Sequence, residues 1–431
     1  MGSLPGFPDG FLVGVSTASY QIEGAVTEGG RGPSIWDTFS HTPGKTRNGD
    51  TGDVACDHYH RWAEDLDLMA ELGAGAYRFS IAWPRIQPDG TGRPRPDGLD
   101  FYDRLVDGLT ARGIAAVPTL FHWDLPQALE DTGGWLSRDT ALRFAEYAGH
   151  VADRLGDRVT RWITLNEPVV HMAQGYAWGT HAPGRTLNLE ALPVAHHQLL
   201  GHGLAVRQLR ERGATEVMIT NNCTPVAPAS DGEADRAAAM LYDGFHNRLF
   251  NEPVLIGEYP QFLAEGLAPV VRDGDLRIIA TPLDALGINY YNPTLVAAPA
   301  DPGEMFELRP IEGVPTTAFG WPVVPDGLHE LLTGLNGAYR LPPVYITENG
   351  CSTEDVLDDR FRIDYLDGHL GAVRRAIADG VDVRGYFVWS LLDNFEWAEG
   401  YSQRFGLVRV DFKTLTRTPR ASFRWLRDAL R

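Results

Sequence analysis

Two glutamates stand at the ends of predicted strands, each inside a short polar motif. Glu167 lies in Thr-Leu-Asn-Glu-Pro (164–168), and Glu348 lies in Ile-Thr-Glu-Asn-Gly (346–350). Either motif alone is weak, because Asn-Gly is common in turns and a glutamate before proline often only closes a strand. Two carboxylates that face one mouth from different strands are the arrangement that cleavage of a glycosidic bond uses. The pair therefore indicates acid/base and nucleophilic chemistry.

The elements that would position these glutamates follow a repeated pattern. A short apolar run, a polar turn and a longer amphipathic stretch recur along the chain. Nearly continuous apolar runs are typical of strands buried on both faces, as in a parallel sheet. Eight such runs are predicted as strands: 11–18, 76–83, 114–121, 160–166, 216–221, 284–290, 343–347 and 384–391.

Helical patterns separate these runs, at 59–72, 139–155 and 362–378 among others. In the first, Trp62, Leu66, Met69 and Leu72 share one face, and Gly73 is placed to cap the helix. Eight strand–helix units predict a closed (β/α)8 TIM barrel with its active site at the C-terminal face of the strands. A doubly wound open sheet is the alternative, but no glycine-rich phosphate loop follows any strand.

The connecting segments at 29–57, 169–195, 222–236 and 292–326 are rich in Gly, Pro, Asp and Thr. We interpret them as long loops that crown the C-terminal face of the barrel rather than as linkers between domains. The expected organisation is one catalytic domain over residues 1–431.

Composition and charge narrow the range of partners and compartments. The chain of 431 residues carries 38 Lys and Arg against 57 Asp and Glu, a net charge of −19. Such an acidic surface repels nucleic acid and anionic lipid, so neither is an expected partner. The three cysteines are few and far apart, and the first ten residues do not resemble a secretory signal. We expect a cytoplasmic protein, with the oligomeric state, monomer or homo-oligomer, left open.

Histidine clusters raise the question of a metal. Residues 57–60 read Asp-His-Tyr-His, and His196, His197 and His202 lie on a predicted helix. Neither group brings a third ligand at a convincing spacing, and glycoside hydrolysis by two carboxylates needs no metal. No metal and no cofactor are expected.

The motifs together resemble one known family, the retaining β-glycosidases of glycoside hydrolase family 1, of the β-glucosidase type. The likeness runs from Phe-Leu-Val-Gly-Val-Ser-Thr-Ala-Ser-Tyr-Gln-Ile-Glu-Gly (11–24) to Phe-Gly-Leu-Val (405–408). Between them, in the family's order, stand segments 77–83, 122–126, 166–168, 287–291, 347–350 and 389–397. So many motifs in the right order make a coincidental match very improbable.

The resemblance implies the catalytic roles. Glu167 would be the general acid/base and Glu348 the nucleophile, with Arg78 and Tyr291 as hydrogen-bond donors to Glu348. A guanidinium beside Glu348 would favour its carboxylate form, whereas Glu167 would lack a cation and keep its proton near neutral pH. The separation expected for a retaining pair is roughly 5–5.5 Å.

The resemblance also implies the sugar site. Glu396 would accept from two neighbouring hydroxyls and repel a 6-phosphate, and no lysine follows it in segment 398–405. Trp389 would stack under the ring, Asn166 would meet the 2-hydroxyl, and Trp321 would face the leaving group. The full set of substrate-binding residues implied is Gln21, His122, Trp123, Asn166, Asn289, Trp321, Trp389, Glu396, Trp397 and Phe405.

The expected function is therefore exo-acting, retaining hydrolysis of unphosphorylated β-D-glucosides, with β-galactosides and β-fucosides as further substrates. Val169–Met172, where many relatives have an aromatic or larger residue after Asn-Glu-Pro, is expected around the leaving-group side or the outer mouth. It motivates one alternative, a transglycosidase with a specialised acceptor; a second is an inactive sugar-binding relative. The resemblance further implies a cis peptide at Trp389–Ser390.

Overall fold

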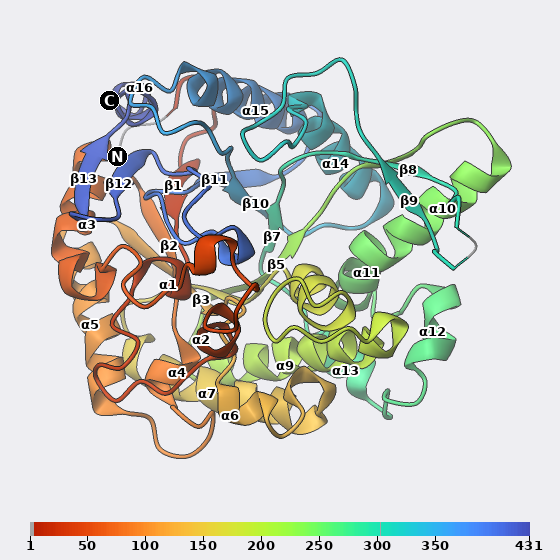
Figure 1. Cartoon of the computed structure of the whole chain (residues 1–431), viewed down its shortest axis with the longest axis horizontal. Helices are drawn as coiled ribbons and strands as arrows, with labels where there is room; N and C mark the ends of the chain where they lie inside the picture. The colour runs from red at the N-terminus through yellow and green to blue at the C-terminus, as the bar shows by residue number, and fades with distance from the viewer. Residues whose placement is uncertain (1–3, 302) are drawn as a thin grey trace.

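A computed structural model describes residues 4–301 and 303–431. Residues 1–3, which begin the segment expected not to be a signal, and residue 302, inside the expected loop 292–326, lie outside the described residues. In the described part of the chain, eight parallel strands close a barrel in the order β1-β2-β3-β4-β5-β7-β10-β11 (Figure 1). They are β1 (Leu12–Ser16), β2 (Ala76–Ser80), β3 (Ala115–Phe121), β4 (Arg161–Asn166), β5 (Glu216–Asn222), β7 (Leu286–Asn289), β10 (Val344–Asn349) and β11 (Val383–Trp389).

Closure of the sheet distinguishes the two folds considered from sequence. β1 pairs in parallel with β2 on one side and with β11 on the other, so the first and last strands of the barrel meet. An open sheet would leave both of them as edges. The predicted (β/α)8 barrel is confirmed, and all eight predicted strands are present.

Side chains fill the lower part of the barrel. A buried cluster inside it draws one residue from each of seven strands or strand entrances: Ala76, Val117, Ile163, Met218, Ala285, Tyr345 and Phe387. The interior of such a barrel is a packed core and not a pore, so an open cavity can form only toward the strand ends.

Helices cover the outside of the barrel (Figure 1). The predicted helix 59–72 is α3 (His58–Leu72); its Leu66, Met69 and Leu72 are buried, and Gly73 ends it in the left-handed conformation. The other helices are α1 (Ser19–Ile22), α2 (Ile35–Ser40), α4 (Trp83–Ile86), α5 (Pro96–Ala111), α6 (Gln127–Glu130), α7 (Arg138–Leu155), α8 (Pro168–Val170), α9 (Leu192–Glu211), α10 (Glu233–Asp243), α11 (Leu249–Leu255), α12 (Gln261–Leu267), α13 (Asp275–Ile279), α14 (Pro325–Ala338), α15 (Arg360–Ala378) and α16 (Ala421–Ala429).

The segments expected as loops contain more regular structure than the sequence suggested. Segment 169–195 includes η3 (His171–Ala177), a π-helix, and segments 222–236 and 292–326 contribute β6 (Val226–Pro228), β8 (Thr294–Ala297) and β9 (Glu307–Arg309) to a small sheet. With α10 this sheet stands at one side of the barrel (Figure 1). A second ribbon pairs β12 (Val408–Asp411) with β13 (Thr416–Pro419). Strands of three or four residues inside segments rich in Gly, Pro, Asp and Thr do not give a hydrophobic pattern long enough to predict.

The predicted strand 76–83 extends beyond the end of the observed strand β2. Segment 76–83 was expected to be extended throughout, but β2 stops at Ser80 and α4 begins at Trp83. Pro84 favours this change, because its ring suits the first turn of a helix, where its missing N–H has no partner to lose. No helix of the described residues combines the length and hydrophobicity needed to cross a bilayer.

Candidate active site

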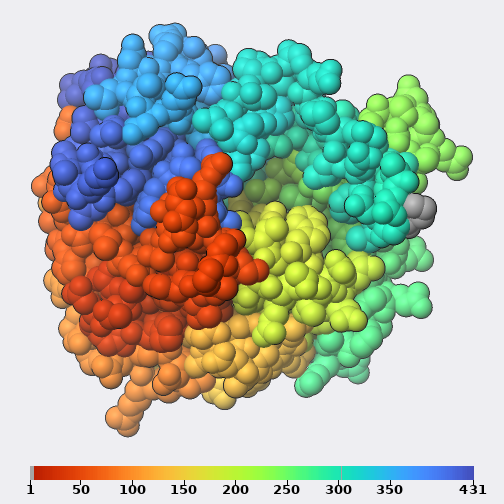
Figure 2. Space-filling view, viewed as in Figure 1, coloured from red at the N-terminus to blue at the C-terminus, as the bar shows by residue number. Residues whose placement is uncertain are grey.

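A cavity of about 420 Å³ opens where the barrel strands end. Figure 2 shows the surface hollowed near the middle of this face, between the red N-terminal, yellow-green, teal and blue C-terminal segments. Ten of the predicted site residues line it: His122, Trp123, Glu167, Tyr291, Trp321, Glu348, Trp389, Glu396, Trp397 and Phe405. The other four, Gln21, Arg78, Asn166 and Asn289, are buried beneath the wall and hydrogen-bonded to residues of it.

Glu348, in β10, is held by a cation and a phenol. The Arg78 guanidinium donates to its Oε1 at 2.5 Å, and the Tyr291 hydroxyl donates to its Oε2 at 2.7 Å. Burial raises the pKa of Glu348, while Arg78 and Tyr291 act in the opposite direction. A direct guanidinium partner stabilises the carboxylate form, so Glu348 is the member of the pair built to carry charge.

Glu167 has a different environment. Two side-chain amides, Asn222 at 3.0 Å and Asn289 at 2.8 Å, donate to the same oxygen, Oε1. Among the described residues no cation forms an ion pair with it. Burial and then the charge of Glu348 raise its pKa to about 8. The surroundings of Glu167 therefore favour its protonated form, whereas Glu348 has a cationic partner.

Asn166 and Asn289 link the two carboxylates. Asn166 Oδ1 accepts from Arg78 at 2.5 Å and from Asn289 Nδ2 at 3.1 Å, and its own amide donates to His122 Nε2 at 3.0 Å. Thr347 donates to Asn289 Oδ1 at 2.8 Å, which leaves the Asn289 amide free to donate to Glu167. This network fixes the orientation of side chains that end different strands.

The opposite wall carries a third carboxylate, Glu396, which is partly exposed. Gln21 donates to its Oε2 at 3.3 Å, and burial followed by the charge of Glu348 raises the pKa of Glu396 to about 8. Gln21 Oε1 and His122 Nδ1 are buried and make no hydrogen bond to any described residue. These atoms can form hydrogen bonds with hydroxyl groups of a ligand without breaking a hydrogen bond inside the protein.

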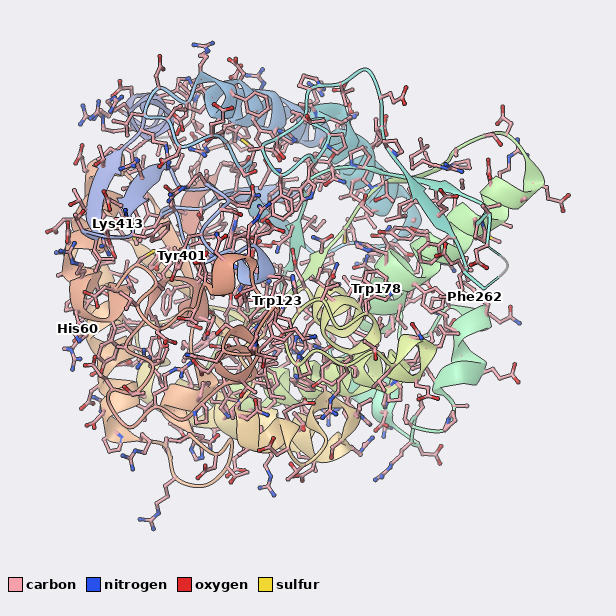
Figure 3. All side chains as sticks on the ribbon, viewed as in Figure 1. His60, Trp123, Trp178, Phe262, Tyr401 and Lys413 are labelled. Atoms are coloured by element: carbon pink, nitrogen blue, oxygen red, sulfur yellow. The ribbon has the colours of Figure 1, made fainter. Side chains whose placement is uncertain are left out.

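Aromatic rings form the rest of the wall. His122 lies nearly parallel to Trp389 and to Trp397, with ring centroids 5.9 and 5.8 Å apart. Trp123, near the centre of Figure 3, donates to the Asn166 carbonyl at 2.8 Å. Toward the outside, Trp321 stacks on Phe319 and contacts Phe405. Flat apolar faces beside polar hydrogen-bonding groups are suited to a sugar ring, which has both kinds of surface.

Of the nine non-glycine residues with positive φ among the described residues, three line this cavity. Glu167, Trp123 and Trp397 have φ values of 46°, 75° and 52°. Bulky residues rarely adopt this left-handed region, and such residues persist where surrounding structure over-determines them, as at active sites. The predicted cis peptide at Trp389–Ser390 is present.

Some of the wall was not foreseen from the sequence. Asn222, His181, Gln174 and Phe319 line the cavity, and Asn222 contacts Glu167 directly. Asn222 ends β5, so its position at a strand end was the available signal. The other three lie in connecting segments, where the sequence gives no register.

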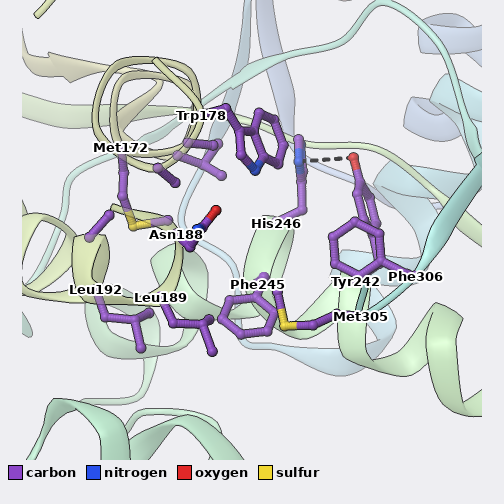
Figure 4. A pocket seen from close by; sticks show the side chains of 14 residues that line it. Met172, Trp178, Asn188, Leu189, Leu192, Tyr242, Phe245, His246, Met305 and Phe306 are labelled. Atoms are coloured by element: carbon purple, nitrogen blue, oxygen red, sulfur yellow. Dashed lines mark hydrogen bonds between the residues drawn. The ribbon is translucent and has the colours of Figure 1, made fainter. Parts of the chain in front are cut away.

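The segment after Glu167 lies differently from the expectation. Val170 lines the catalytic cavity, but Val169 and Met172 face a separate apolar pocket, which we call the lateral pocket (Figure 4). Of the residues from Val169 to Met172, only Val170 therefore lines the catalytic cavity. A helical turn begins at Pro168, so successive side chains point about 100° apart, and Val169 and Val170 face different cavities.

Neither histidine cluster forms a metal centre in the described residues, where no group of three candidate ligands comes together. His58 bonds to Asp65 at 2.7 Å and His196 to Asp275 at 3.0 Å. His202 bonds to the Thr164 hydroxyl at 2.6 Å. These histidines take part in buried hydrogen bonds that join neighbouring elements.

Two carboxylates at different strand ends of a (β/α)8 barrel, around one aromatic-walled cavity, define a glycoside hydrolase. Comparison with known proteins agrees. The profile of glycosyl hydrolase family 1 matches residues 5–431. This chain therefore belongs to glycosyl hydrolase family 1, and the resemblance found in its motifs is confirmed.

Individual relatives are similar over nearly their whole length. The thermostable beta-glucosidase B of Thermobispora bispora is 51% identical, over 99% of this chain and 90% of the relative. A bifunctional beta-D-glucosidase/beta-D-fucosidase of Bifidobacterium breve is 48% identical, covering 98% and 97%. Among solved structures, virulence factor SghA from Agrobacterium tumefaciens is 48% identical with a TM-score of 0.96, covering 99% of this chain and 97% of that one.

Proposed function

We propose that this family 1 enzyme is a β-glucosidase that removes single unphosphorylated β-D-glucosyl units with retention of configuration, and that β-D-fucosides and β-D-galactosides are further substrates. The names of the relatives support the glucosidase activity, and one name adds fucosidase activity. The observation that carries the mechanism is the contrast between the two carboxylates: Glu348 bonds a guanidinium and a phenol, whereas Glu167 bonds only amides.

In the first step Glu348 is the nucleophile and Glu167 the acid. A Glu348 carboxylate oxygen attacks the anomeric carbon, the bond from that carbon to the leaving oxygen breaks, and the Glu167 proton passes to that oxygen. In the second step Glu167 takes a proton from water, whose oxygen attacks the anomeric carbon and displaces Glu348. Two inversions give net retention.

The electrostatic coupling supports the change of role of Glu167. The charge of Glu348 is, after burial, the main cause of the raised pKa of Glu167. Once Glu348 is esterified to the sugar that charge is gone, so the pKa of Glu167 falls. A group that begins as an acid thereby becomes a carboxylate base in the second step.

The far wall supports recognition of an unmodified sugar. We assign Glu396, Gln21 and His122 to the sugar hydroxyls and Trp389 to the ring face. Burial of a carboxylate at this wall makes a second anion, such as a 6-phosphate, unfavourable. The basic residue closest in sequence, Arg404, lies within 3.5 Å of Asp393 and of Asp355, so its charge is already partnered by acids.

The nucleophile is tested with Glu348→Gly. Hydrolysis of an aryl β-glucoside should fall by at least about 10³-fold, and azide should restore turnover as a glycosyl azide of inverted, α configuration. Wild-type hydrolysis followed by NMR should release β-glucose first, which also tests the expected 5–5.5 Å separation indirectly. Near-normal turnover of the variant, or α-glucose as first product, would overturn the assignment.

We also propose that the enzyme acts in the cytoplasm and without a nucleic-acid partner. Cys56, Cys223 and Cys351 are buried free thiols, which fits a reducing compartment. The net charge of −19 opposes binding to a phosphate backbone. Fractionation of the source cells and a nucleic-acid shift assay test the two statements.

A further inference from the structure

The lateral pocket reaches the catalytic glutamate through a chain of side chains. It is a cavity of about 100 Å³ whose wall includes Val169, Met172, Tyr242 and His246. Figure 4 shows His246 hydrogen-bonded to Tyr242 at one end of this pocket. On its other side His246 bonds Asn222, and Asn222 bonds Glu167.

In the series Tyr242–His246–Asn222–Glu167, each hydrogen bond is donated by the residue farther from Glu167. Asn222 Nδ2 donates to Glu167 Oε1 at 3.0 Å, so the Asn222 Oδ1 on the other side can only accept. His246 Nε2 lies 3.0 Å from that Oδ1 and must therefore carry the hydrogen. Its Nδ1 then accepts from the Tyr242 hydroxyl at 3.3 Å. Burial lowers the pKa of His246 to about 4, so the ring is neutral and has this one tautomer.

A parallel arrangement orients the second amide on Glu167. Thr347 donates to Asn289 Oδ1 as His246 donates to Asn222 Oδ1, and each amide then presents its N–H to Glu167 Oε1. An oxygen that accepts hydrogen bonds from two N–H groups is an unfavourable position for the carboxyl proton, because that proton would lie close to the two amide hydrogens. The acidic proton of Glu167 therefore lies on Oε2, the oxygen that remains for the leaving group.

We propose that His246 is a positioning residue of the general acid: it fixes the orientation of the Asn222 amide, which keeps the Glu167 proton on Oε2. This proposal rests on the proposed role of Glu167. Without the His246 donor, the Asn222 side chain can turn and present its oxygen to Glu167. That oxygen repels the carboxylate and accepts from the protonated form, so the pKa of Glu167 rises and its proton moves to the wrong oxygen.

A change at position 246 leaves the other groups around Glu167 in place. The titratable and charged side chains that face Glu167 or line its cavity are Glu348, Glu396, Glu399, Arg78, Tyr291, Cys223, His122 and His181. None of them bonds to His246, so a shift of the Glu167 titration in a position-246 variant reports the Asn222 contact.

The test compares two β-glucosides in His246→Leu. For a poor leaving group, such as methanol, kcat/KM should fall about 10-fold with KM little changed, because the misplaced proton weakens acid catalysis. The alkaline limb of its pH profile should move up by about half to one pH unit. For 2,4-dinitrophenyl β-glucoside, whose leaving group needs no proton, kcat/KM should stay within about twofold.

Three further variants separate positioning from structural damage. His246→Gln, which keeps an N–H near the Nε2 position, should recover most of the loss. Tyr242→Phe removes only the distal donor and should give a smaller shift in the same direction. Phe245→Leu alters the lateral pocket but removes none of the hydrogen bonds that link Tyr242 to Glu167, so it should leave the alkaline limb unmoved.

Equal losses on both substrates with an unmoved alkaline limb in His246→Leu and Tyr242→Phe would overturn the positioning role. Failure of the proposed function would be visible separately in Glu167→Ala. That variant should lose methyl glucoside hydrolysis while retaining kcat/KM on the dinitrophenyl substrate. Equal losses on both would remove Glu167 as the acid, and this proposal with it.

Discussion

Three glutamates around one cavity have the same carboxyl group but different partners. Glu348 bonds Arg78 and Tyr291, Glu167 bonds two amides, and Glu396 bonds the amide of Gln21. Desolvation acts on all three in the same direction, so hydrogen-bonded partners decide which one ionises first. At the scale of single residues, the proposed division between nucleophile and acid follows from which partner each carboxylate has.

Tyr291→Phe tests the support of Glu348. Loss of a donor destabilises the carboxylate, so the pKa of Glu348 should rise and the acidic limb of kcat/KM should move to higher pH by about half to one unit. The adjacent Tyr290→Phe is a matched control, because the Tyr290 hydroxyl donates to the Val324 carbonyl at 2.7 Å. It should leave the acidic limb in place. Identical pH profiles for both variants would contradict this role of Tyr291.

Glu167→Gln tests the energetic cost of the raised pKa. Glu167 ionises near 4.5 when unfolded and near 8 when folded, so folding binds a proton between these values. Stability from this group is complete below about pH 4.5 and is lost as pH rises toward 8. Glutamine has no such loss, so melting at pH 8 should occur roughly 2–5 °C above wild type, with no gain at pH 4.5.

The control for that measurement is Glu265→Gln on α12, which removes one negative charge at an exposed position. Its melting temperature should stay within about 1 °C of wild type at both pH values. A Glu167→Gln difference that does not grow with pH would show that the gain has another origin.

At the scale of elements, the ends of strands converge on the site. Glu348 and Asn349 end β10, Trp389 ends β11, Asn222 ends β5, and Asn289 ends β7. Parallel strands in a closed barrel bring their carboxyl ends to one rim, so residues far apart in sequence become neighbours. Gly350, the last residue of the Ile-Thr-Glu-Asn-Gly motif, lets the ends of β10 and β11 approach closely, because a Cβ on Gly350 would overlap the Trp389 carbonyl oxygen.

Gly350→Ala should therefore separate the ends of β10 and β11. The clash involves backbone and cannot be relieved by a rotamer change, so we expect a loss of about 2 kcal/mol or more in the free energy of unfolding. Activity should fall as well, because Glu348 and Trp389 lie on the two strands. Gly334→Ala in α14, where a Cβ meets nothing within 4 Å, should instead gain about 0.5–1 kcal/mol. Urea denaturation measures both, and equal midpoints would refute the close approach.

At the scale of the whole molecule, the C-terminal segment holds in place the loop after β11 that contains Asp393 and Glu396. Arg420, just before α16, makes two bonds of 2.9 Å to Asp393, which lies three residues before Glu396. Both side chains are 0% exposed. Arg420 also donates to the Val356 and Gly406 carbonyls, so it joins segments that follow β10 and β11.

Arg420→Met should destabilise the fold by about 2–4 kcal/mol, because buried Asp393 loses its two bonds of 2.9 Å and keeps only Arg404, at 3.5 Å, as a cationic partner. The exposed pair Arg360–Asp364, with side chains 73% and 62% exposed, gives the matched control. Arg360→Met should change the free energy of unfolding by no more than about 1 kcal/mol. Similar urea midpoints for the two variants would mean that the Asp393 charge is relieved in some other way.

The sequence was sufficient for the barrel and for most of its site. Long apolar runs at regular intervals predicted all eight strands. The motifs at their ends, with the family resemblance, predicted that Glu167, Glu348, Arg78 and Tyr291 come together at one cavity. The sequence was not sufficient for Asn222, or for the different directions of Val169 and Val170. Those depend on side-chain direction at the rim and in a short helical turn, which no pattern of apolar residues specifies.

What the sequence determined by itself is the set of strands, their order along the chain and the chemical groups at their ends, because hydrophobic periodicity and residue type are local properties. The tertiary structure alone decided which donors reach each carboxylate. Whether Glu167 faces amides while Glu348 faces a guanidinium depends on contacts between residues 55 to 270 positions apart in the sequence. Only closure of the barrel brings such groups within a hydrogen bond of one another, and that distance sets which glutamate keeps its proton.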